Sequence, residues 1–149
     1  MAVVADPTGA VLSLWEPKTH IGAGLVNAPG GLSWNELGTN DVAKAKDFYS
    51  GLFGWSMDDQ EGSMGSYTMI QNGERANGGI RALSEQEQGV PSNWLVYFGV
   101  SSVDDTAAKA AELGASTLVP PTEIPIGKFA VLADPQGAVF ALFAGDFDD

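Results

Sequence analysis

The feature that most constrains this chain is a repeat of fourteen residues near its two ends. Residues 2–15 read AVVADPTGAVLSLW and residues 130–143 read AVLADPQGAVFALF, with nine identical positions at an offset of 128. Each copy runs through Asp-Pro-x-Gly, a tight turn in which proline presets φ and glycine tolerates positive φ. Each copy therefore predicts a β-hairpin, and their spacing indicates duplicated domains. Convergence of two unrelated hairpins is the alternative.

The first copy of the hairpin stands at the beginning of the chain, although such a hairpin should end a domain. We therefore expect residues 1–30 to be the remnant of a lost preceding domain with a linker rich in proline and glycine. Val3, Val11 and Trp15 would form an exposed apolar edge. The expectation is a homodimer in which this segment exchanges between two copies. Folding back onto its own body is the alternative.

The body predicts two modules of the same order, residues 31–84 and 91–149. In the first, LSWNELGT (32–39) alternates like a strand. Residues 40–54 have apolar residues at helical spacing between a capping Asn40 or Asp41 and Gly54. Three further strands are expected within residues 55–83.

The second module repeats this pattern. Residues 93–100 predict a strand, residues 102–114 predict a helix with Ser102 as N-cap, and three more strands are expected within residues 116–145. Two βαβββ modules in tandem predict an α+β fold. Its eight-stranded mixed sheet would curve around a cavity, with the helices outside and the N-terminal hairpin as an extra element.

Aligning the two helix caps relates the first strands of the modules. Leu95 then corresponds to Trp34, and Tyr97 corresponds to Glu36. Because side chains alternate along a strand, these four are expected on the concave face of the sheet. The intervening positions are expected to face the helices: Leu37, Val96 and Phe98.

Composition excludes several classes of function. The chain has no cysteine, which rules out disulfides, thiolate metal sites and cysteine nucleophiles. Its net charge of −12 disfavours nucleic acids and anionic membranes as partners. No apolar run is long enough to span a bilayer and the first residues lack a basic signal-peptide region, so we expect a cytoplasmic protein.

Two segments resemble the vicinal oxygen chelate superfamily, which includes glyoxalase I, extradiol dioxygenases and bleomycin-resistance proteins. They are WNELGTNDVAKAKDFYSGLFGW (34–55) and VLADPQGAVFALF (131–143). The chain is most similar to the second domain of two-domain glyoxalase-like proteins, some of them labelled hydroxylases. In those proteins a linker like HIGAGLVNAPGGLSWNEL joins the domains. The resemblance implies that residues 31–149 are a vicinal oxygen chelate domain.

The resemblance also implies four metal-ligand positions, which family enzymes fill with His or Glu on the first and last strands of each module. Here these positions carry Trp34, Leu95, Ala141 and, approximately, Gly79. None of these side chains can bind a metal, and His20 lies outside the body. The sequence therefore predicts neither a metal nor another cofactor.

Glu36 is the one carboxylate expected inside the cavity. It can act as a general base, anchor a cationic ligand, or be a hydrogen-bonded glutamate without chemistry. Tyr97 is expected to approach Glu36 or to be a core aromatic, and Trp34 can stack on a planar ligand. The other ligand-binding candidates are Tyr67, Met69, Leu95, Phe129 and Ala141.

Two functions follow from these candidates. The favoured hypothesis is a metal-free small-molecule-binding protein of the bleomycin-resistance type, with a planar or cationic aromatic ligand. The alternative is a glyoxalase-like lyase or isomerase that uses Glu36 as general base or a non-standard metal site.

Overall fold

The computed structural model describes residues 1–62 and 65–146. Its strands are β1 (Ala2–Ala5), β2 (Val11–Leu14), β3 (Leu32–Thr39), β4 (Ser56–Gly62), β5 (Gly65–Asn72), β6 (Arg75–Ala82), β7 (Asn93–Gly99), β8 (Ser116–Ile124), β9 (Gly127–Ala133) and β10 (Val139–Gly145). Its helices are α1 (Val42–Phe53), the short 3₁₀ helix η1 (Glu85–Glu87) and α2 (Val103–Glu112). Within the described residues, no helix is both long and apolar enough to cross a membrane.

Eight of the strands form a mixed sheet in the order β4-β5-β6-β3-β7-β10-β9-β8, and β1 and β2 form a separate two-stranded sheet. This confirms the predicted α+β fold with two successive βαβββ segments and an extra hairpin. The chain divides into two compact units. Unit 1 comprises residues 1–22 and 35–94, and unit 2 comprises residues 23–34 and 95–149.

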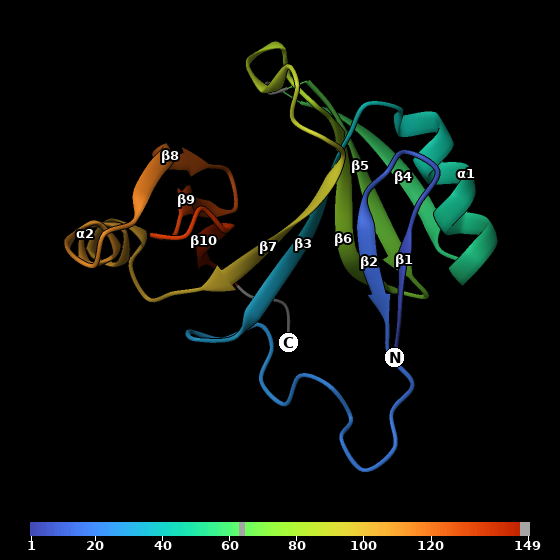
Figure 1. Ribbon diagram of the computed structural model, residues 1–149, viewed down its shortest axis with the longest axis horizontal. Helices are drawn as coiled ribbons and strands as arrows, with labels where there is room; N and C mark the ends of the chain where they lie inside the picture. Colours follow the sequence, from blue (N-terminus) through green and yellow to red (C-terminus); the bar gives the residue numbers. More distant parts are fainter. Residues whose placement is uncertain (63–64, 147–149) are drawn as a thin grey trace. The chain divides into compact units, whose positions relative to one another are not determined.

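Unit 1 is built around α1. The side chain of Asp41 caps the helix by accepting a hydrogen bond from the Lys44 backbone N–H at 3.0 Å. Gly54 ends the helix in the left-handed conformation, with φ of 70°. Ala45 and Tyr49, one turn apart, are buried against a core that includes Leu37 of β3. The predicted caps and apolar helix face are confirmed, and Figure 1 shows α1 alongside β4.

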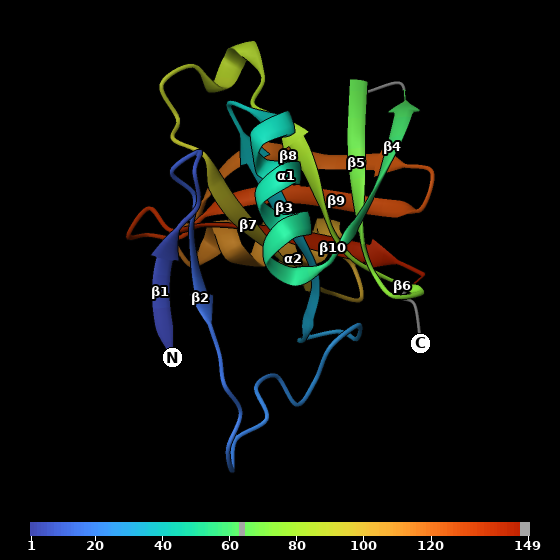
Figure 2. The same ribbon diagram turned by 90° about the vertical axis from the view of Figure 1, so that its right-hand side faces the viewer.

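Unit 2 contains β8, β9 and β10, which lie side by side (Figure 2). Strand β10 pairs antiparallel with β9 and parallel with β7, so that Ala141 lies opposite Tyr97. Ser102 caps α2 through a hydrogen bond from the Asp105 backbone N–H. The buried residues beneath this helix come from β9 and β10: Ala130, Leu132 and Leu142.

The prediction that a helix covers the side chain of Phe98 is wrong. Phe98 lies on β7, and its side chain is 40% exposed, with a ring contact to Phe140. The apolar face of α2 is short and is formed by small residues such as Val103 and Ala107, which pack on β9 and β10. The equivalent prediction for Leu37 in unit 1 is confirmed, because Leu37 is fully buried beside α1.

The two repeated hairpins fold in the same way. The Asp6 carbonyl accepts a hydrogen bond from Gly9 N–H at 3.0 Å, and the Asp134 carbonyl accepts one from Gly137 N–H at 2.9 Å. The two glycines have φ of 97° and 92°, values that favour glycine. The repeat predicted from sequence therefore extends to the backbone geometry of the turn.

The N-terminal hairpin packs against its own unit. The Tyr49 hydroxyl donates a hydrogen bond to Asp6 Oδ2 at 2.8 Å and accepts one from Trp94 Nε1 at 3.0 Å. Ala10, which follows the turn, is fully buried in the same core as Tyr49. The single chain thus adopts the arrangement in which the hairpin folds back. Exchange of the hairpin between two copies stays a prediction.

Candidate functional site

Glu36 lies on the face of β3 opposite Leu37, as the alternation of the strand predicts. Its Oε1 accepts a hydrogen bond from Arg81 Nε at 2.8 Å, within an ion pair. Its Oε2 accepts one from the Tyr67 hydroxyl at 3.2 Å. The side chain of Glu36 is only 11% exposed. Both carboxylate oxygens are therefore engaged by donors from β5 and β6.

Arg81 connects Glu36 to a second carboxylate, that of Glu87 in η1. The Arg81 guanidinium donates to both Glu87 oxygens, at 2.7 and 2.8 Å. The hydrogen bonds from Arg81 are the main cause that lowers the pKa of Glu87 to about 2, and bonds from Ser84 add to it. Hydrogen bonds to Glu87 and Glu36 likewise raise the pKa of Arg81. We call Glu36, Tyr67, Arg81 and Glu87 the carboxylate cluster.

Gly79 makes room for this cluster. It lies opposite Glu36 in the parallel pairing of β3 and β6. A Cβ atom at this position would overlap the ring and hydroxyl of Tyr67. The tyrosine therefore crosses over the glycine to reach Glu36. Met69, another predicted ligand-binding residue, lies opposite Gly79 on β5 and is half-buried.

A second group of predicted residues gathers in unit 2. Leu95, Tyr97 and Ala141 are buried together, and partly buried apolar side chains pack around them. We call this group the aromatic cluster, and its members are Trp34, Leu95, Tyr97, Phe129, Val131, Ala141 and Phe143. Five of the eight predicted ligand-binding residues belong to it: Trp34, Leu95, Tyr97, Phe129 and Ala141. The other three, Glu36, Tyr67 and Met69, belong to unit 1.

The residues at the four implied metal positions do not fit a metal ion. Trp34, Leu95 and Ala141 lie in the aromatic cluster, and Gly79 lies beneath Tyr67. None offers the imidazole or carboxylate donors that a divalent metal needs in this kind of site. Across residues 1–62 and 65–146, no three or more His, Cys, Asp or Glu side chains group together in a way that could hold a metal.

The sequence prediction missed Arg81 and Glu87. A usable signal was present, because Arg81 follows Gly79 by two residues on the same strand and therefore shares its face. Glu87 could not be inferred in this way, because it lies on a loop whose path only the tertiary structure shows. The predicted approach of Tyr97 to Glu36 would join the two units and stays a prediction.

Comparisons with known proteins agree with this architecture. The model of the Glyoxalase/Bleomycin resistance protein/Dioxygenase superfamily matches residues 31–142. CFP32 of Mycobacterium tuberculosis (strain CDC 1551 / Oshkosh), which bears a provisional glyoxylase name, is 43% identical over 144 residues. That match covers 95% of this chain and 54% of CFP32.

Another relative is the anthracycline biosynthesis protein DnrV of Streptomyces peucetius. It is 35% identical over 146 residues, which cover 95% of this chain and 51% of DnrV. The chain thus spans about half the length of the curated relatives that it matches.

Solved structures share the fold at low sequence identity. Methylmalonyl-CoA epimerase from Mycobacterium tuberculosis has a TM-score of 0.59 at 13% identity, over 77% of this chain and 87% of the epimerase. An extradiol ring-cleaving dioxygenase from B. fuscum has a TM-score of 0.57 at 21% identity, over 87% of this chain and 36% of the dioxygenase. At these identities the likeness concerns the fold alone.

Proposed function

Because this chain belongs to the Glyoxalase/Bleomycin resistance protein/Dioxygenase superfamily, we propose that it binds a planar aromatic small molecule without a metal. The aromatic cluster is the proposed ligand-binding surface.

The main support for this proposal is the composition of the aromatic cluster. Three positions at which the family resemblance implies metal ligands carry Trp34, Leu95 and Ala141, and these residues belong to a cluster with further aromatic side chains. Aromatic rings bind planar molecules by stacking, and a single polar group such as the Tyr97 hydroxyl can orient them. The site chemistry therefore favours sequestration of a ligand over metal-assisted catalysis.

Two further observations bear on the ligand. DnrV is named as an anthracycline biosynthesis protein, a name that points to a fused-ring aromatic compound. The net charge of −12 favours the approach of cations over anions. Together they favour a planar ligand with a positive charge.

The proposal is tested by calorimetric titration of the protein with an anthracycline and with an aminoacridine dye. We expect saturable binding, and we expect Trp34→Ala to weaken it about fivefold, since one lost stacking ring is worth about 1 kcal/mol. Trp15→Ala is the matched control, because Trp15 lies on the hairpin outside the aromatic cluster. Its affinity should equal that of the wild type.

Absence of saturable binding for every probe, or equal affinity in Trp34→Ala and wild type, would reject the proposed binding surface. The metal-free part has its own test. The protein is incubated with Fe²⁺, Mn²⁺, Ni²⁺ or Zn²⁺, desalted and analysed for metal. Stoichiometric retention of any of these ions would contradict it.

The carboxylate cluster supports a second candidate, a lyase or isomerase in which Glu36 is the general base. Arg81 and Tyr67 hold the Glu36 carboxylate in a defined position. Proton abstraction would require a substrate to displace one of these donors, which is why we rank this function second.

This second candidate is tested with a 2-oxoaldehyde and a thiol as substrates, the chemistry that a glyoxylase name suggests. Turnover by the wild type should be abolished in Glu36→Gln and retained in Glu112→Gln, which changes an exposed helix residue. Equal turnover in Glu36→Gln and wild type would exclude Glu36 as the base.

A further inference from the structure

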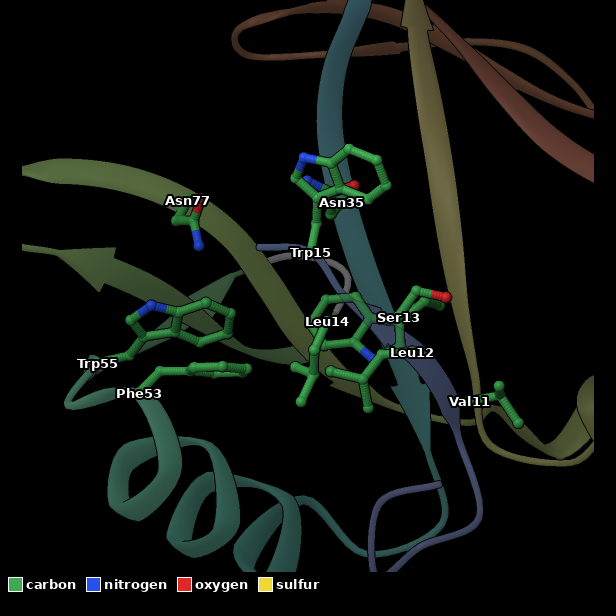
Figure 3. A pocket seen from close by; sticks show the side chains of 10 residues that line it. Val11, Leu12, Ser13, Leu14, Trp15, Asn35, Phe53, Trp55 and Asn77 are labelled. Atoms are coloured by element: carbon green, nitrogen blue, oxygen red, sulfur yellow. The ribbon is translucent and has the colours of Figure 1, made fainter. Parts of the chain in front are cut away.

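The two faces of the sheet in unit 1 differ in chemistry. A groove of about 640 Å³ lies beside the N-terminal hairpin, and Figure 3 shows Leu14, Phe53 and Trp55 among the side chains around it. No charged side chain is among the lining residues of this groove. Glu36 and the groove residue Asn35 are neighbours on β3, so their side chains point to opposite faces of the sheet. A charged group of a ligand would find partners in the carboxylate cluster and not in this groove.

Arg81 lies at the centre of the carboxylate cluster, and one end of its guanidinium is firmly held. Arg81 Nε donates to Glu36 Oε1 at 2.8 Å, and the Glu36 side chain is only 11% exposed. The Tyr67 hydroxyl holds the other oxygen of the same carboxylate. Glu36 therefore fixes the orientation of the guanidinium plane. An arginine that is held in this way presents its terminal N–H groups as a rigid fork.

The fork of Arg81 carries the carboxylate of Glu87. Nη1 and Nη2 donate to the two Glu87 oxygens at 2.7 and 2.8 Å, which is the two-point geometry with which guanidinium groups recognise carboxylates. The side chains of Arg81 and Glu87 are 30% and 28% exposed. Because water reaches this pair, a departing Glu87 carboxylate would be solvated at once and would leave no buried charge behind. The partner on the fork can therefore exchange, whereas the partner on Nε is fixed.

Glu87 belongs to the connection of residues 83–92, which we call the β6–β7 loop and which Figure 1 shows extending beyond the end of β6. The loop is attached to the sheet at its two ends. Leu83 N–H donates to the Thr39 carbonyl at 2.9 Å, and the Ser92 hydroxyl donates to Thr39 Oγ1 at 3.4 Å. Between these ends the residues are exposed, except for the half-buried Glu87. The hydrogen bonds that join this middle part to the strands come from the guanidinium fork.

Gly38 leaves space beside the fork. It pairs with Arg81 in the parallel register of β3 and β6. A Cβ atom at this position would lie 3.7 Å from Arg81 Nη2 and 3.0 Å from the Leu83 side chain at the start of the loop. The guanidinium thus lies over a residue without a side chain, next to the point where the loop leaves the sheet. Movement of the loop would open this side of the fork.

We propose that the fork of Arg81 is a binding site for the carboxylate group of a small molecule, and that Glu87 is its internal occupant. A ligand carboxylate replaces that of Glu87 on Nη1 and Nη2, and the middle of the β6–β7 loop moves into solvent. The charge beside the guanidinium stays the same, because one carboxylate replaces another. Glu36 orients the fork in both states. The site depends neither on ligand binding by the aromatic cluster nor on Glu36 acting as a base.

An internal occupant weakens the apparent affinity for the ligand. The apparent dissociation constant equals the intrinsic constant divided by the fraction of molecules in which the fork is free. If Glu87 occupies the fork in about nine-tenths of the molecules, its removal should tighten ligand binding about tenfold.

The test uses propionate as the probe and propionamide as its uncharged counterpart. Neither has a ring, so the outcome is independent of the stacking surface proposed above. Binding at constant ionic strength is followed by NMR at the Arg81 Nε–H signal. We expect Glu87→Gln to bind propionate with saturation and about tenfold more tightly than the wild type, and to bind no propionamide. Glu85→Gln is the matched control, because it removes the same charge from an exposed position of the same short helix, and it should bind propionate like the wild type.

Two further measurements separate a ligand site from a purely structural ion pair. Hydrogen exchange in residues 84–90 of the wild type should become faster as propionate binds, because Glu87 is then released. Arg81→Lys keeps a positive charge beside Glu36 but removes the two-point fork, so we expect it to lose propionate binding. If Arg81→Lys does not fold, the comparison of propionate with propionamide in Glu87→Gln decides.

Three results would overturn the proposal. The first is a Glu87→Gln protein that does not bind propionate with saturation, or that binds propionamide equally well. The second is equal affinity for propionate in Glu87→Gln and Glu85→Gln. The third is propionate binding that is retained in Arg81→Lys. The calorimetric titration with aromatic ligands has no bearing on these results, so this site and the proposed function can fail separately.

Discussion

Gly79 illustrates how one residue determines the geometry of the carboxylate cluster. In the sequence it stands near a position at which the family resemblance implies a metal ligand. In the structure it is the gap through which the Tyr67 side chain reaches Glu36. Any side chain at this position would compete with the tyrosine for the same space.

We predict that Gly79→Ala lowers the free energy of unfolding by about 1–2 kcal/mol, the loss expected for a hydrogen bond to a charged group plus local repacking. The new Cβ would displace the Tyr67 hydroxyl from Glu36. Urea unfolding followed by far-UV circular dichroism measures the change.

Gly51→Ala is the control for this substitution. Gly51 lies in α1, and a Cβ added there meets no atom within 4 Å. Alanine should leave stability unchanged or raise it slightly, because glycine in a helix costs about 0.5–1 kcal/mol. If Gly79→Ala has no cost, or keeps its cost in a Tyr67→Ala background, the contact with Tyr67 is not the cause.

At the scale of elements, the two repeated hairpins contain the same turn in different surroundings. The Asp6 carboxylate accepts hydrogen bonds from the backbone of Thr8 and Ala10, as that of Asp134 does in the second hairpin. Asp6 differs in that it is buried and also accepts a bond from Tyr49. One side chain thus closes the turn and attaches the hairpin to α1.

The attachment of the hairpin should depend on pH. Burial raises the pKa of Asp6, but hydrogen bonds from Thr8, Tyr49 and the backbone outweigh it and lower the pKa below the ordinary 3.8. Because the pKa is lower in the folded state, the stabilisation is present above 3.8 and is lost as the pH falls through the folded value.

We predict that Asp6→Asn lowers the free energy of unfolding by about 2 kcal/mol near pH 6, and by less near pH 3. Urea unfolding of both proteins at the two pH values measures this. Asp134→Asn is the control, because it alters the equivalent turn without a tyrosine contact, so it should cost less than Asp6→Asn near pH 6. An equal cost for Asp6→Asn at both pH values would contradict the assignment.

The contribution of Tyr49 to stability depends on pH in the opposite sense to that of Asp6. Burial is the main cause that raises the pKa of its hydroxyl; the hydrogen bond from Trp94 opposes this, and the hydrogen bond to Asp6 and the charge of Asp6 raise the pKa further. The neutral hydroxyl is thus favoured by folding. Its contribution to stability is complete below pH 10, the ordinary value, and is lost only as the pH rises through the folded value.

At the scale of the whole molecule, charge is the dominant property. Nineteen acidic and seven basic side chains repel one another on balance, and this repulsion destabilises a compact state. Ion pairs such as Lys128 with Asp104 and Lys46 with Asp59 relieve it only locally. Salt should therefore stabilise the folded protein, since it screens charges over about 10 Å at 0.1 M.

We predict that the midpoint of thermal unfolding at pH 7 rises when NaCl is increased from low to moderate concentration. The control is the same comparison near pH 4.1, the isoelectric point, where net repulsion vanishes and NaCl should have no such effect. A rise of equal size at both pH values would show that salt acts through something other than net charge.

The sequence by itself determined the elements of this protein. Alternation and helical spacing predicted the strands and helices, and Asp41, Ser102 and Gly54 predicted where the helices begin and end. These signals are local, since a cap or a turn depends on residues only a few positions apart. The Asp-Pro-x-Gly repeat was visible for the same reason, and the two turns proved to have the same hydrogen bonds.

Only the tertiary structure decided which side chains meet. Glu36 was predicted to face inward, but its partners Arg81 and Tyr67 come from strands that lie 45 and 31 residues away. The exposure of Phe98 likewise depends on where α2 packs, which its sequence pattern does not specify. Among the described residues, the second copy of the fourteen-residue pattern pairs with β7 as well as within its hairpin, whereas the first copy pairs only within its hairpin, because pairing depends on strands distant in the sequence.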